Sequence, residues 1–285
     1  MRNFWELVEA KWQGTKALCV GHDPDPQKMP EDFKRRLLDQ ADVNALYDFC
    51  SAIVRATAET VACWKPNFAF FEAFGSGGIN TLGRLIGRMH EFAPDVPVIL
   101  DCKRGDIGNS NNGSAEMAFN RLGADAVTLS PYLGIGALEP FLKRPEKGCI
   151  LLCRTSNPEA AELQDKIQTD GRPLYLHVAD LISTQLKKTG NVGLVMGATY
   201  PEQLRLAREQ VGDEMFILVP AIGTQGGKAS EVVPVSYVPG KGRVLYNVSR
   251  AIIHASANPD FATVAQDKAR EYDAEIRQYA RSLNS

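Results

Sequence analysis

Eight short, mostly apolar runs recur along the chain, separated by segments with helical periodicity. The apolar runs cover residues 17–20, 61–64, 96–100, 124–129, 149–153, 192–196, 216–219 and 244–246. Because they are continuous rather than alternating in polarity, they are typical of strands in a parallel sheet that is covered on both faces. The segments between them predict helices, most clearly over residues 32–56, 79–92, 114–122, 173–188 and 201–211, with a last helix over 262–283.

This alternation of strands and helices predicts the architecture. Eight strand–helix units in 285 residues favour a single (β/α)8 TIM barrel domain over residues 1–285. The alternative is an open, doubly wound sheet. No Gly-x-Gly-x-x-Gly follows the first predicted strand, which weakens the dinucleotide-binding form of that alternative.

Composition and charge narrow the class of protein. The hydrophobic fraction of 44% and the charged fraction of 23% are ordinary for a soluble globular protein. A net charge of -2 gives no general attraction to nucleic acid or to an anionic membrane. The six cysteines form no Cys-x-x-Cys pair, and the N-terminal residues lack the apolar core of a signal peptide. We therefore expect buried thiols, no membrane segment and a cytoplasmic enzyme.

The most informative chemistry follows the third apolar run, where Asp101, Lys103 and Asp106 come in quick succession. Side chains alternate between the faces of a strand, so Asp101 and Lys103 are predicted to share a face and Cys102 to point away. Charged groups at the end of a buried strand are costly unless they are paired or functional. This block therefore predicts an ammonium group held among carboxylates, suited to proton donation.

Other polar residues fall at the ends of the remaining predicted strands. In a TIM barrel these ends form the active site, so Asp23, Lys65, Ser156 and Arg250 are predicted to lie near one another. The glycine-rich turn around Gln225, with Arg250, is typical of a phosphate site, because backbone N–H groups and a guanidinium can hold an anion. Residues 226–242, which bear glycines and show little periodicity, are the candidate closing loop.

Each feature has a simpler interpretation when taken alone. Asp101 and Lys103 could form a structural ion pair at a barrel rim, Lys65 could be solvated, and Asp23 could be a turn residue. The four histidines lack metal-ligand spacing and are interpreted as non-catalytic. The functional reading rests on convergence, since all the candidates follow predicted strands.

Several blocks together resemble the orotidine 5′-phosphate decarboxylase family, in its longer bacterial form. They are Val20-Gly-His-Asp-Pro-Asp-Pro26, Lys65-Pro-Asn-Phe-Ala-Phe-Phe-Glu72, Leu100-Asp-Cys-Lys-Arg-Gly-Asp-Ile-Gly-Asn-Ser110, Pro131-Tyr-Leu-Gly134, Cys153-Arg-Thr-Ser-Asn-Pro158, Gly197-Ala-Thr-Tyr-Pro201, Ile222-Gly-Thr-Gln-Gly-Gly227 and Asn247-Val-Ser-Arg-Ala-Ile252. The blocks occur in order over nearly the whole chain, and Asp-x-Lys-x-x-Asp is the most specific. The chain departs from the family pattern at His22, Cys102 and Ala221.

The resemblance implies decarboxylation of orotidine 5′-monophosphate to uridine 5′-monophosphate in pyrimidine biosynthesis. It implies no metal and no organic cofactor, a small-molecule nucleotide as substrate, and a homodimer with a shared active site. The resemblance also implies a role for each residue. Lys103 would donate a proton to C6, Asp101 would lie beside the substrate carboxylate, and Asp106 would come from the partner subunit. Lys65 would support this set and contact the ribose, Asp23 would contact the ribose, Ser156 the pyrimidine ring, and Gln225 and Arg250 the phosphate.

Two other functions stay open at this point. One is a related barrel that acts on a sugar phosphate with Mg²⁺, which would lose activity on chelation. The other is a non-catalytic nucleotide-binding protein, which would bind pyrimidine nucleotides without turnover. The closely spaced lysines weaken the case for the Mg²⁺-dependent enzyme, because they occupy the space that a metal ion would need. A buried lysine beside aspartates weakens the case for a non-catalytic binding protein, since nucleotide binding alone does not require such a lysine.

Overall fold

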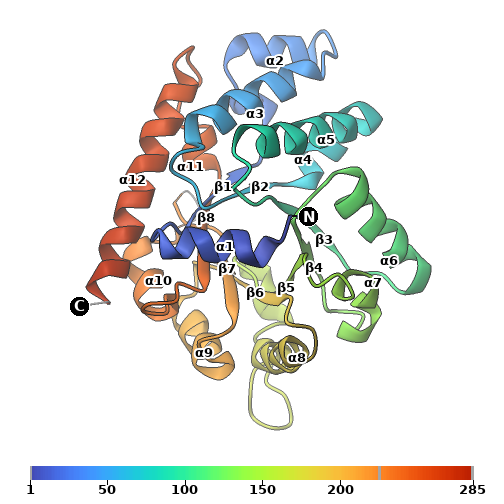
Figure 1. Ribbon diagram of the computed structural model, residues 1–285, viewed down its shortest axis with the longest axis vertical. Coiled ribbons are helices and arrows are strands. Elements are labelled where there is room, and N and C mark those ends of the chain that lie inside the picture. Colours follow the sequence, from blue (N-terminus) through green and yellow to red (C-terminus); the bar gives the residue numbers. More distant parts are fainter. Residues whose placement is uncertain (1, 224–225, 284–285) are drawn as a thin grey trace.

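The computed structural model describes residues 2–223 and 226–283. The strands form one parallel sheet in the order β2-β1-β8-β7-β6-β5-β4-β3 (Figure 1). They are β1 (Leu18–His22), β2 (Cys63–Pro66), β3 (Ile99–Arg104), β4 (Ala126–Leu129), β5 (Gly148–Arg154), β6 (Val192–Met196), β7 (Phe216–Val219) and β8 (Val244–Val248). Parallel bridges from Trp64 to Val98 and from Asn67 to Asp101 bring β2 and β3 together. The predicted TIM barrel is confirmed, and the open sheet is wrong.

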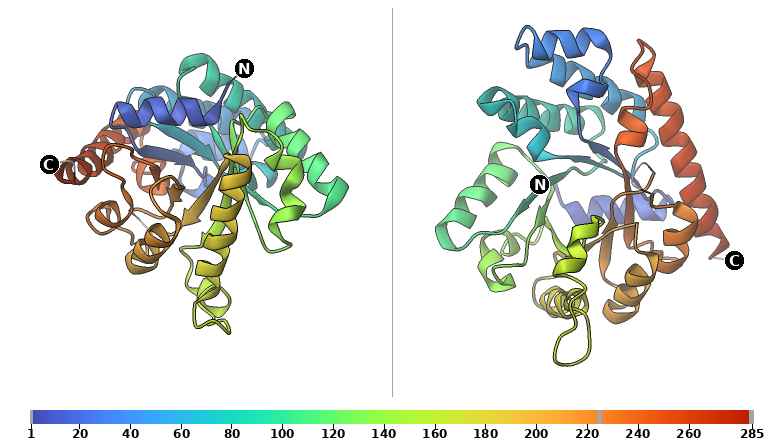
Figure 2. Two further views of the ribbon diagram at one scale, coloured as in Figure 1. Left: turned by 60° about the horizontal axis from the view of Figure 1, so that its bottom comes forward. Right: turned by 180° about the vertical axis from the view of Figure 1, so that it is seen from behind.

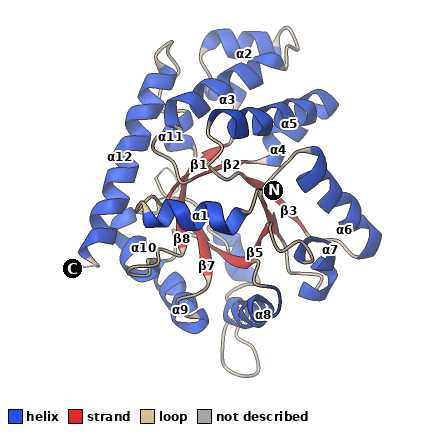
Figure 3. Cartoon of the chain, in the orientation of Figure 1, coloured by secondary structure: helices blue, strands red, loops and turns tan. Residues whose placement is uncertain are grey.

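Helices surround the barrel, and the first of them covers one of its ends; Figure 3 shows the helices in blue around the red strands. They are α1 (Phe4–Gln13), α2 (Glu31–Leu38), α3 (Asn44–Thr57), α4 (Phe68–Glu72), α5 (Gly75–Phe92), α6 (Gly108–Ala115), α7 (Glu139–Leu142), α8 (Leu174–Thr189), α9 (Pro201–Val211), α10 (Ala229–Ser236), α11 (Arg250–Ile253) and α12 (Phe261–Ser282). The outer core lies between this ring and the outer faces of the strands.

Some predicted boundaries were wrong. The expected helix over 32–56 is two helices, because Ala41 has a left-handed φ of 52° and the Asp42 carboxylate accepts the N–H of Asn44 at 3.0 Å, where α3 begins. The candidate closing loop over 226–242 contains α10, whose Val232 and Val233 are buried. That segment packs as a helix, so its description as one loop was wrong.

Helix α1 closes one end of the barrel and was not predicted. Figure 2 shows this dark blue helix lying against that end of the sheet. The indole N–H of Trp12 donates to the carbonyl of Val244 at 2.8 Å, at the start of β8. Phe4 packs so closely on Gly148, at the start of β5, that a Cβ there would lie 2.5 Å from its ring. The N-terminal ends of the strands are therefore covered, and the C-terminal ends carry the cavity.

The barrel interior begins with one apolar layer. Each strand contributes at least one residue that packs there with α1, namely Cys19, Cys63, Ile99, Ala126, Ile150, Val195, Leu218 and Leu245, and β7 adds Phe216. Side chains repeat their direction every second residue along a strand. The residues two positions further on therefore point inward, nearer the C-terminal ends, where active sites of this architecture lie.

Candidate active site

A cavity of about 550 Å³ opens at the C-terminal ends of the strands. Several of its lining residues come two positions after the apolar layer, as alternation requires: Lys65 on β2, Asp101 on β3, Thr128 on β4 and Asn247 on β8. Asp23, Lys103, Ser156 and Arg250 also line it. The structure thus brings six of the predicted site residues to one cavity, Lys65 and Asp101 included.

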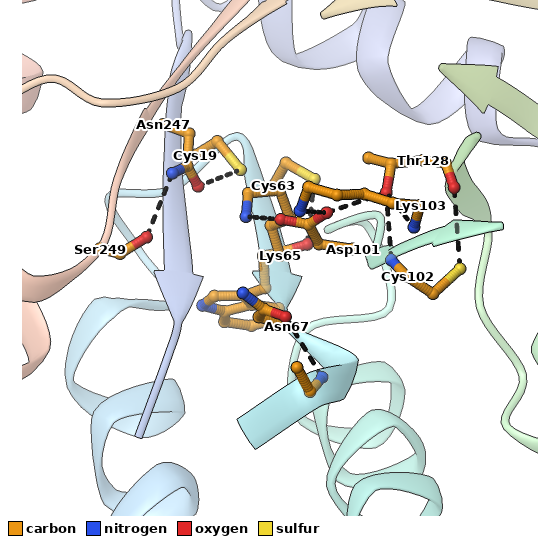
Figure 4. A network of polar contacts seen from close by, with 12 residues as sticks. Cys19, Cys63, Lys65, Asn67, Asp101, Cys102, Lys103, Thr128, Asn247 and Ser249 are labelled. Carbon is orange, nitrogen blue, oxygen red and sulfur yellow. Dashed lines mark hydrogen bonds and ion pairs between the residues drawn. The ribbon is translucent and has the colours of Figure 1, made fainter. Parts of the chain in front are cut away.

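The centre of the cavity is a carboxylate between two lysines (Figure 4). Asp101 Oδ2 lies 2.8 Å from Nζ of Lys65, and Oδ1 lies 2.6 Å from Nζ of Lys103. Lys65 and Asp101 are nearly buried, whereas the Lys103 side chain is 50% exposed. Lys103 is therefore the most accessible member of this set to a molecule in the cavity.

Charge pairing fixes the ionisation of the two buried members. Burial alone would raise the pKa of Asp101, but the ammonium groups of Lys65 and Lys103 outweigh it and hold that pKa well below its usual range. Burial alone would lower the pKa of Lys65, but the carboxylates of Asp101 and Asp23 outweigh it and raise that pKa. Asp101 therefore stays anionic and Lys65 cationic at neutral pH.

Strand β3 leaves regular pairing where it carries these charges. Its register with β4 shifts between Leu100 and Arg104, and Lys103 has a left-handed φ of 47°. Thr128 Oγ1 accepts the backbone N–H groups of Cys102 and Lys103, each at 3.0 Å. As predicted, Asp101 and Lys103 meet on one face, while Cys102 packs against the outer core.

Asp23 follows β1 and adds a second carboxylate to the cavity. Its Oδ1 is buried and finds no hydrogen-bond partner within residues 2–223 and 226–283. The neighbouring Gly21 permits close packing of β1 on the end of β8, because a Cβ there would lie 1.9 Å from Oγ of Ser249. A buried carboxylate oxygen without a donor is costly, so this atom is suited to accept a hydrogen bond from a bound hydroxyl.

Ser156 lies on the segment after β5, and buried Arg154 anchors that segment. The Arg154 guanidinium binds both oxygens of Asp165, at 2.8 and 2.9 Å, and stacks 3.8 Å from the centre of the Tyr200 ring. Thr199 donates to the carbonyl of Ser156 at 3.0 Å. Bidentate pairing and ring stacking make Arg154 a rigid support beside the cavity.

One of the two side chains expected to contact a phosphate lies at the cavity. Arg250, the first residue of α11, lines the cavity, whereas Gln225 lies outside the described residues. The N–H groups of Gly223, Gly226 and Gly227 donate to carbonyls of their own turn, at 3.0, 2.9 and 3.2 Å. These three N–H groups are therefore engaged within the turn, and the role of the turn as a phosphate site stays a prediction.

Asp106 does not line the cavity. It faces a neighbouring hollow with Arg104, Met117 and Leu133, and its Oδ1 accepts the N–H of Ile107 at 2.7 Å. Within one chain the Lys103 ammonium is therefore paired with Asp101 rather than held between Asp101 and Asp106. The two carboxylates of the block therefore line different hollows, Asp101 the cavity and Asp106 its neighbour.

The three departures from the family pattern leave the charged set intact. His22 is buried on the outer face of β1, and burial, together with nearby Lys65, lowers its pKa to about 3. Ala221 lines the cavity with a left-handed φ of 80°, a region that favours glycine. Cys102 faces away from the cavity, as described above.

Thr128 and Asn247 were not singled out from the sequence, although both line the cavity. Thr128 lies inside the fourth apolar run and Asn247 just beyond the eighth. Counting every second residue from the apolar layer toward each strand end would have identified both. The signal was present, but it required the inward face of each strand to be known.

Comparison with known proteins places the chain in a family. Residues 18–265 match the family model described as orotidine 5′-phosphate decarboxylase / HUMPS family. The orotidine 5′-phosphate decarboxylase of Roseiflexus castenholzii is 45% identical over 270 residues, which cover 94% of this chain and 95% of the relative. That of Ralstonia nicotianae is 42% identical over 277 residues, covering 97% and 98%.

The chain belongs to the orotidine 5′-phosphate decarboxylase family. The structure of Leishmania donovani OMP decarboxylase agrees, with a TM-score of 0.82 at 32% identity over 98% of this chain and 99% of that one. The family and the enzyme class predicted from the sequence motifs are thus confirmed. No helix within the described ranges has the length and apolar character needed to cross a membrane.

Proposed function

We propose that this protein decarboxylates orotidine 5′-monophosphate to uridine 5′-monophosphate in de novo pyrimidine biosynthesis, with Lys103 as the proton donor and without a metal ion. The observation that carries the proposal is the Lys65–Asp101–Lys103 set, in which one carboxylate binds two ammonium groups at 2.8 and 2.6 Å. Family membership supports the reaction, and the half-exposed Lys103 supplies a proton at the cavity.

The remaining cavity residues suit the other parts of this nucleotide. Oδ1 of Asp23, which has no donor among the residues that the structure describes, is available to a ribose hydroxyl next to Lys65. Ser156, held by Thr199, would contact the pyrimidine ring. Arg250, with Gln225, would bind the phosphate, because a guanidinium forms paired hydrogen bonds with phosphate oxygens. The substrate would then be held at its phosphate while C6 faces Lys103.

The reaction follows from these charges. When the C6 carboxylate departs as CO2, the electron pair of the broken bond stays on C6. A fixed ammonium group stabilises that developing negative charge through space, since no adjacent group can delocalise it. Lys103 then transfers a proton to C6, which gives uridine 5′-monophosphate, and the resulting amine regains a proton from water.

Asp101 has two roles in this scheme. It holds the two lysines in place, and its negative charge lies beside the substrate carboxylate, where it becomes less unfavourable as neutral CO2 leaves. Both of its oxygens are occupied by ammonium groups, which repel a divalent cation. This occupation supports chemistry without a metal.

The test is the ultraviolet absorbance change when purified protein is mixed with orotidine 5′-monophosphate, with and without a chelator. We expect turnover that survives chelation and that is abolished by Lys103→Ala in a folded protein. Lys143→Ala is the matched control, because its side chain is equally exposed, at 51%, but lies outside the cavity. Turnover lost on chelation, or near-normal activity of Lys103→Ala, would refute the proposed mechanism.

We also propose that the enzyme is a homodimer in which the partner subunit supplies Asp106 to the site. Asp106 lies outside its own chain's cavity, beside a hollow lined by Met117 and Leu133. Ile107, Tyr132 and Leu133 are large apolar side chains exposed near the same strand ends. Apolar side chains exposed together are typical of an interface between subunits.

A mixing experiment distinguishes a shared site from a site within one chain. In a two-fold dimer, Lys103→Ala and Asp106→Ala chains would together form one site with both mutations and one with neither. An equal mixture, exchanged to random pairing, should regain about a quarter of wild-type activity. No recovery in a mixture that has exchanged subunits would place Asp106 in the site of its own chain and overturn the proposal.

A further inference from the structure

Thr128 is a buried residue of β4 whose hydroxyl bonds three consecutive residues of β3 (Figure 4). Its Oγ1 accepts the N–H groups of Cys102 and Lys103, each at 3.0 Å, and lies 2.8 Å from Oδ1 of Asp101. A hydroxyl has two acceptor positions and one proton. Because the two N–H groups occupy both acceptor positions, the proton is directed to Asp101.

The local backbone needs such an acceptor. Register pairs Leu100 with Val127 and Arg104 with Leu129, so β3 advances four residues while β4 advances two. Residues in such a bulge lose their regular ladder partners. Lys103 also has a φ of 47°, which is unfavourable for a residue with a Cβ. The Thr128 hydroxyl takes the place of the missing ladder carbonyls for Cys102 and Lys103.

The same hydroxyl also determines where the carboxylate and the proton donor lie. Oδ1 of Asp101 accepts from Thr128 and from Nζ of Lys103, at 2.8 and 2.6 Å. Oδ2 accepts from Lys65 at 2.8 Å. Lys65 approaches from β2 and Lys103 from β3 itself, so Thr128 is the uncharged third donor, on the β4 side. It orients the carboxylate without adding charge to the cavity.

We propose that Thr128 is a positioning residue for decarboxylation, which fixes the β3 bulge so that Asp101 and Lys103 meet the substrate in one arrangement. This inference rests on the proposed function. Thr128 acts through Asp101 and Lys103 rather than on the reacting atoms. Small errors in the placement of reacting groups are costly, because much of the rate depends on alignment.

The test compares Thr128→Val, which keeps the shape and removes the hydroxyl, with Thr128→Ser, which keeps the hydroxyl and removes the methyl group. For Thr128→Val we expect kcat to fall by about 10- to 150-fold, the range of one hydrogen bond to a charged group. Affinity for uridine 5′-monophosphate, measured by calorimetry, should stay near wild type, because this product lacks the departing carboxylate. Thr128→Ser should retain most of the wild-type kcat.

Thr57→Val is a matched control. Thr57 is equally buried, and its hydroxyl makes two hydrogen bonds, to the carbonyl of Ile53 and from the indole of Trp64, but it lies on α3 and does not line the cavity. We expect this variant to lose stability and to keep its kcat. A simple loss of stability therefore gives a different result from a loss of positioning.

The outcomes separate this inference from the proposed function. A wild-type kcat in Thr128→Val would overturn the role of the hydroxyl, and so would a loss of kcat in Thr128→Ser as large as that in Thr128→Val. If Thr128→Val does not fold, the kcat of Thr128→Ser decides. If the wild type itself does not turn over orotidine 5′-monophosphate, the proposed function fails. A crystal structure of Thr128→Val then decides the positioning role: a rearranged Lys103 backbone supports it, and an unchanged Asp101–Lys103 pair refutes it.

Discussion

Replacing Lys65 with methionine should expose the cost of an uncompensated charge in the barrel. Lys65 and Asp101 form an ion pair at 2.8 Å, with side chains only 4% and 11% exposed. Removal of one member of a buried pair typically costs about 3–5 kcal/mol, because the other charge stays buried. Asp101 still keeps its bonds to Lys103 and Thr128. We therefore expect the lower end of this range, about 3 kcal/mol, in the free energy of unfolding.

A double variant tests the reason for that loss. Lys65→Met combined with Asp101→Asn also removes the unpaired carboxylate charge. The double variant should therefore lose less free energy of unfolding than the two single variants lose in sum. The difference should be about 2 kcal/mol, within the usual range for residues in direct contact. The assay is urea unfolding at pH 7, followed by circular dichroism and tryptophan fluorescence.

The matched control is Lys11→Met. Lys11 is nearly as buried as Lys65, at 8% exposure, but its ion-pair partner Asp95 is 73% exposed and can be solvated. We expect at most about 1 kcal/mol from this change. If Lys65→Met costs no more than Lys11→Met, or if the double variant loses the full sum, the charge-burial argument is refuted.

The same variant should change the response to acid. The depressed pKa of Asp101 contributes stability above the unfolded value of 3.8, and this contribution is lost as pH falls through the folded pKa. Without Lys65 that pKa rises toward 3.8, so the contribution of Asp101 in Lys65→Met should be smaller, and its loss on acidification should be complete at a higher pH than in the wild type. Unfolding measured over a pH series checks the direction, and a shift to lower pH would contradict it.

Three further predictions concern other parts of the molecule. Arg250→Ala should raise KM by roughly 10- to 150-fold with little change in kcat, as expected for loss of a charged phosphate contact; an unchanged KM would place the phosphate elsewhere. Ala221→Gly should raise the free energy of unfolding by about 0.5–1 kcal/mol, because φ is 80° at this residue, and a loss of stability in urea would argue against strain. His90 and Arg2 outweigh burial and lower the pKa of Asp125 to about 2 from 3.8, so its contribution of about 2 kcal/mol should be lost as pH falls below 4. Asp125→Asn should show a flatter acid profile than the wild type, and parallel profiles would refute this.

Much of the site could be predicted because its signals are local. Strand alternation alone placed Asp101 and Lys103 on one face, and the structure joins them at 2.6 Å. Features that depend on distant partners were missed. Helix α1 has local signals, because Phe4, Val8 and Trp12 recur at helical spacing after the capping Asn3, but its place across the barrel end depends on packing against Gly148 and Val244, far along the chain. The acceptor role of Thr128 depends on a register shift between two strands, which no local pattern records.

The sequence by itself determined the strand–helix alternation, the polar residues that follow each strand, and the family, because these follow from short-range periodicity and from motifs. Only the tertiary structure decided which of those residues share a cavity. Closure of the barrel brings Lys65 from β2 to Asp101 on β3, whereas Asp106 lines the neighbouring hollow. The physical reason is that a charge in a buried site is stabilised by groups distant in sequence, and their distances are set by register and closure.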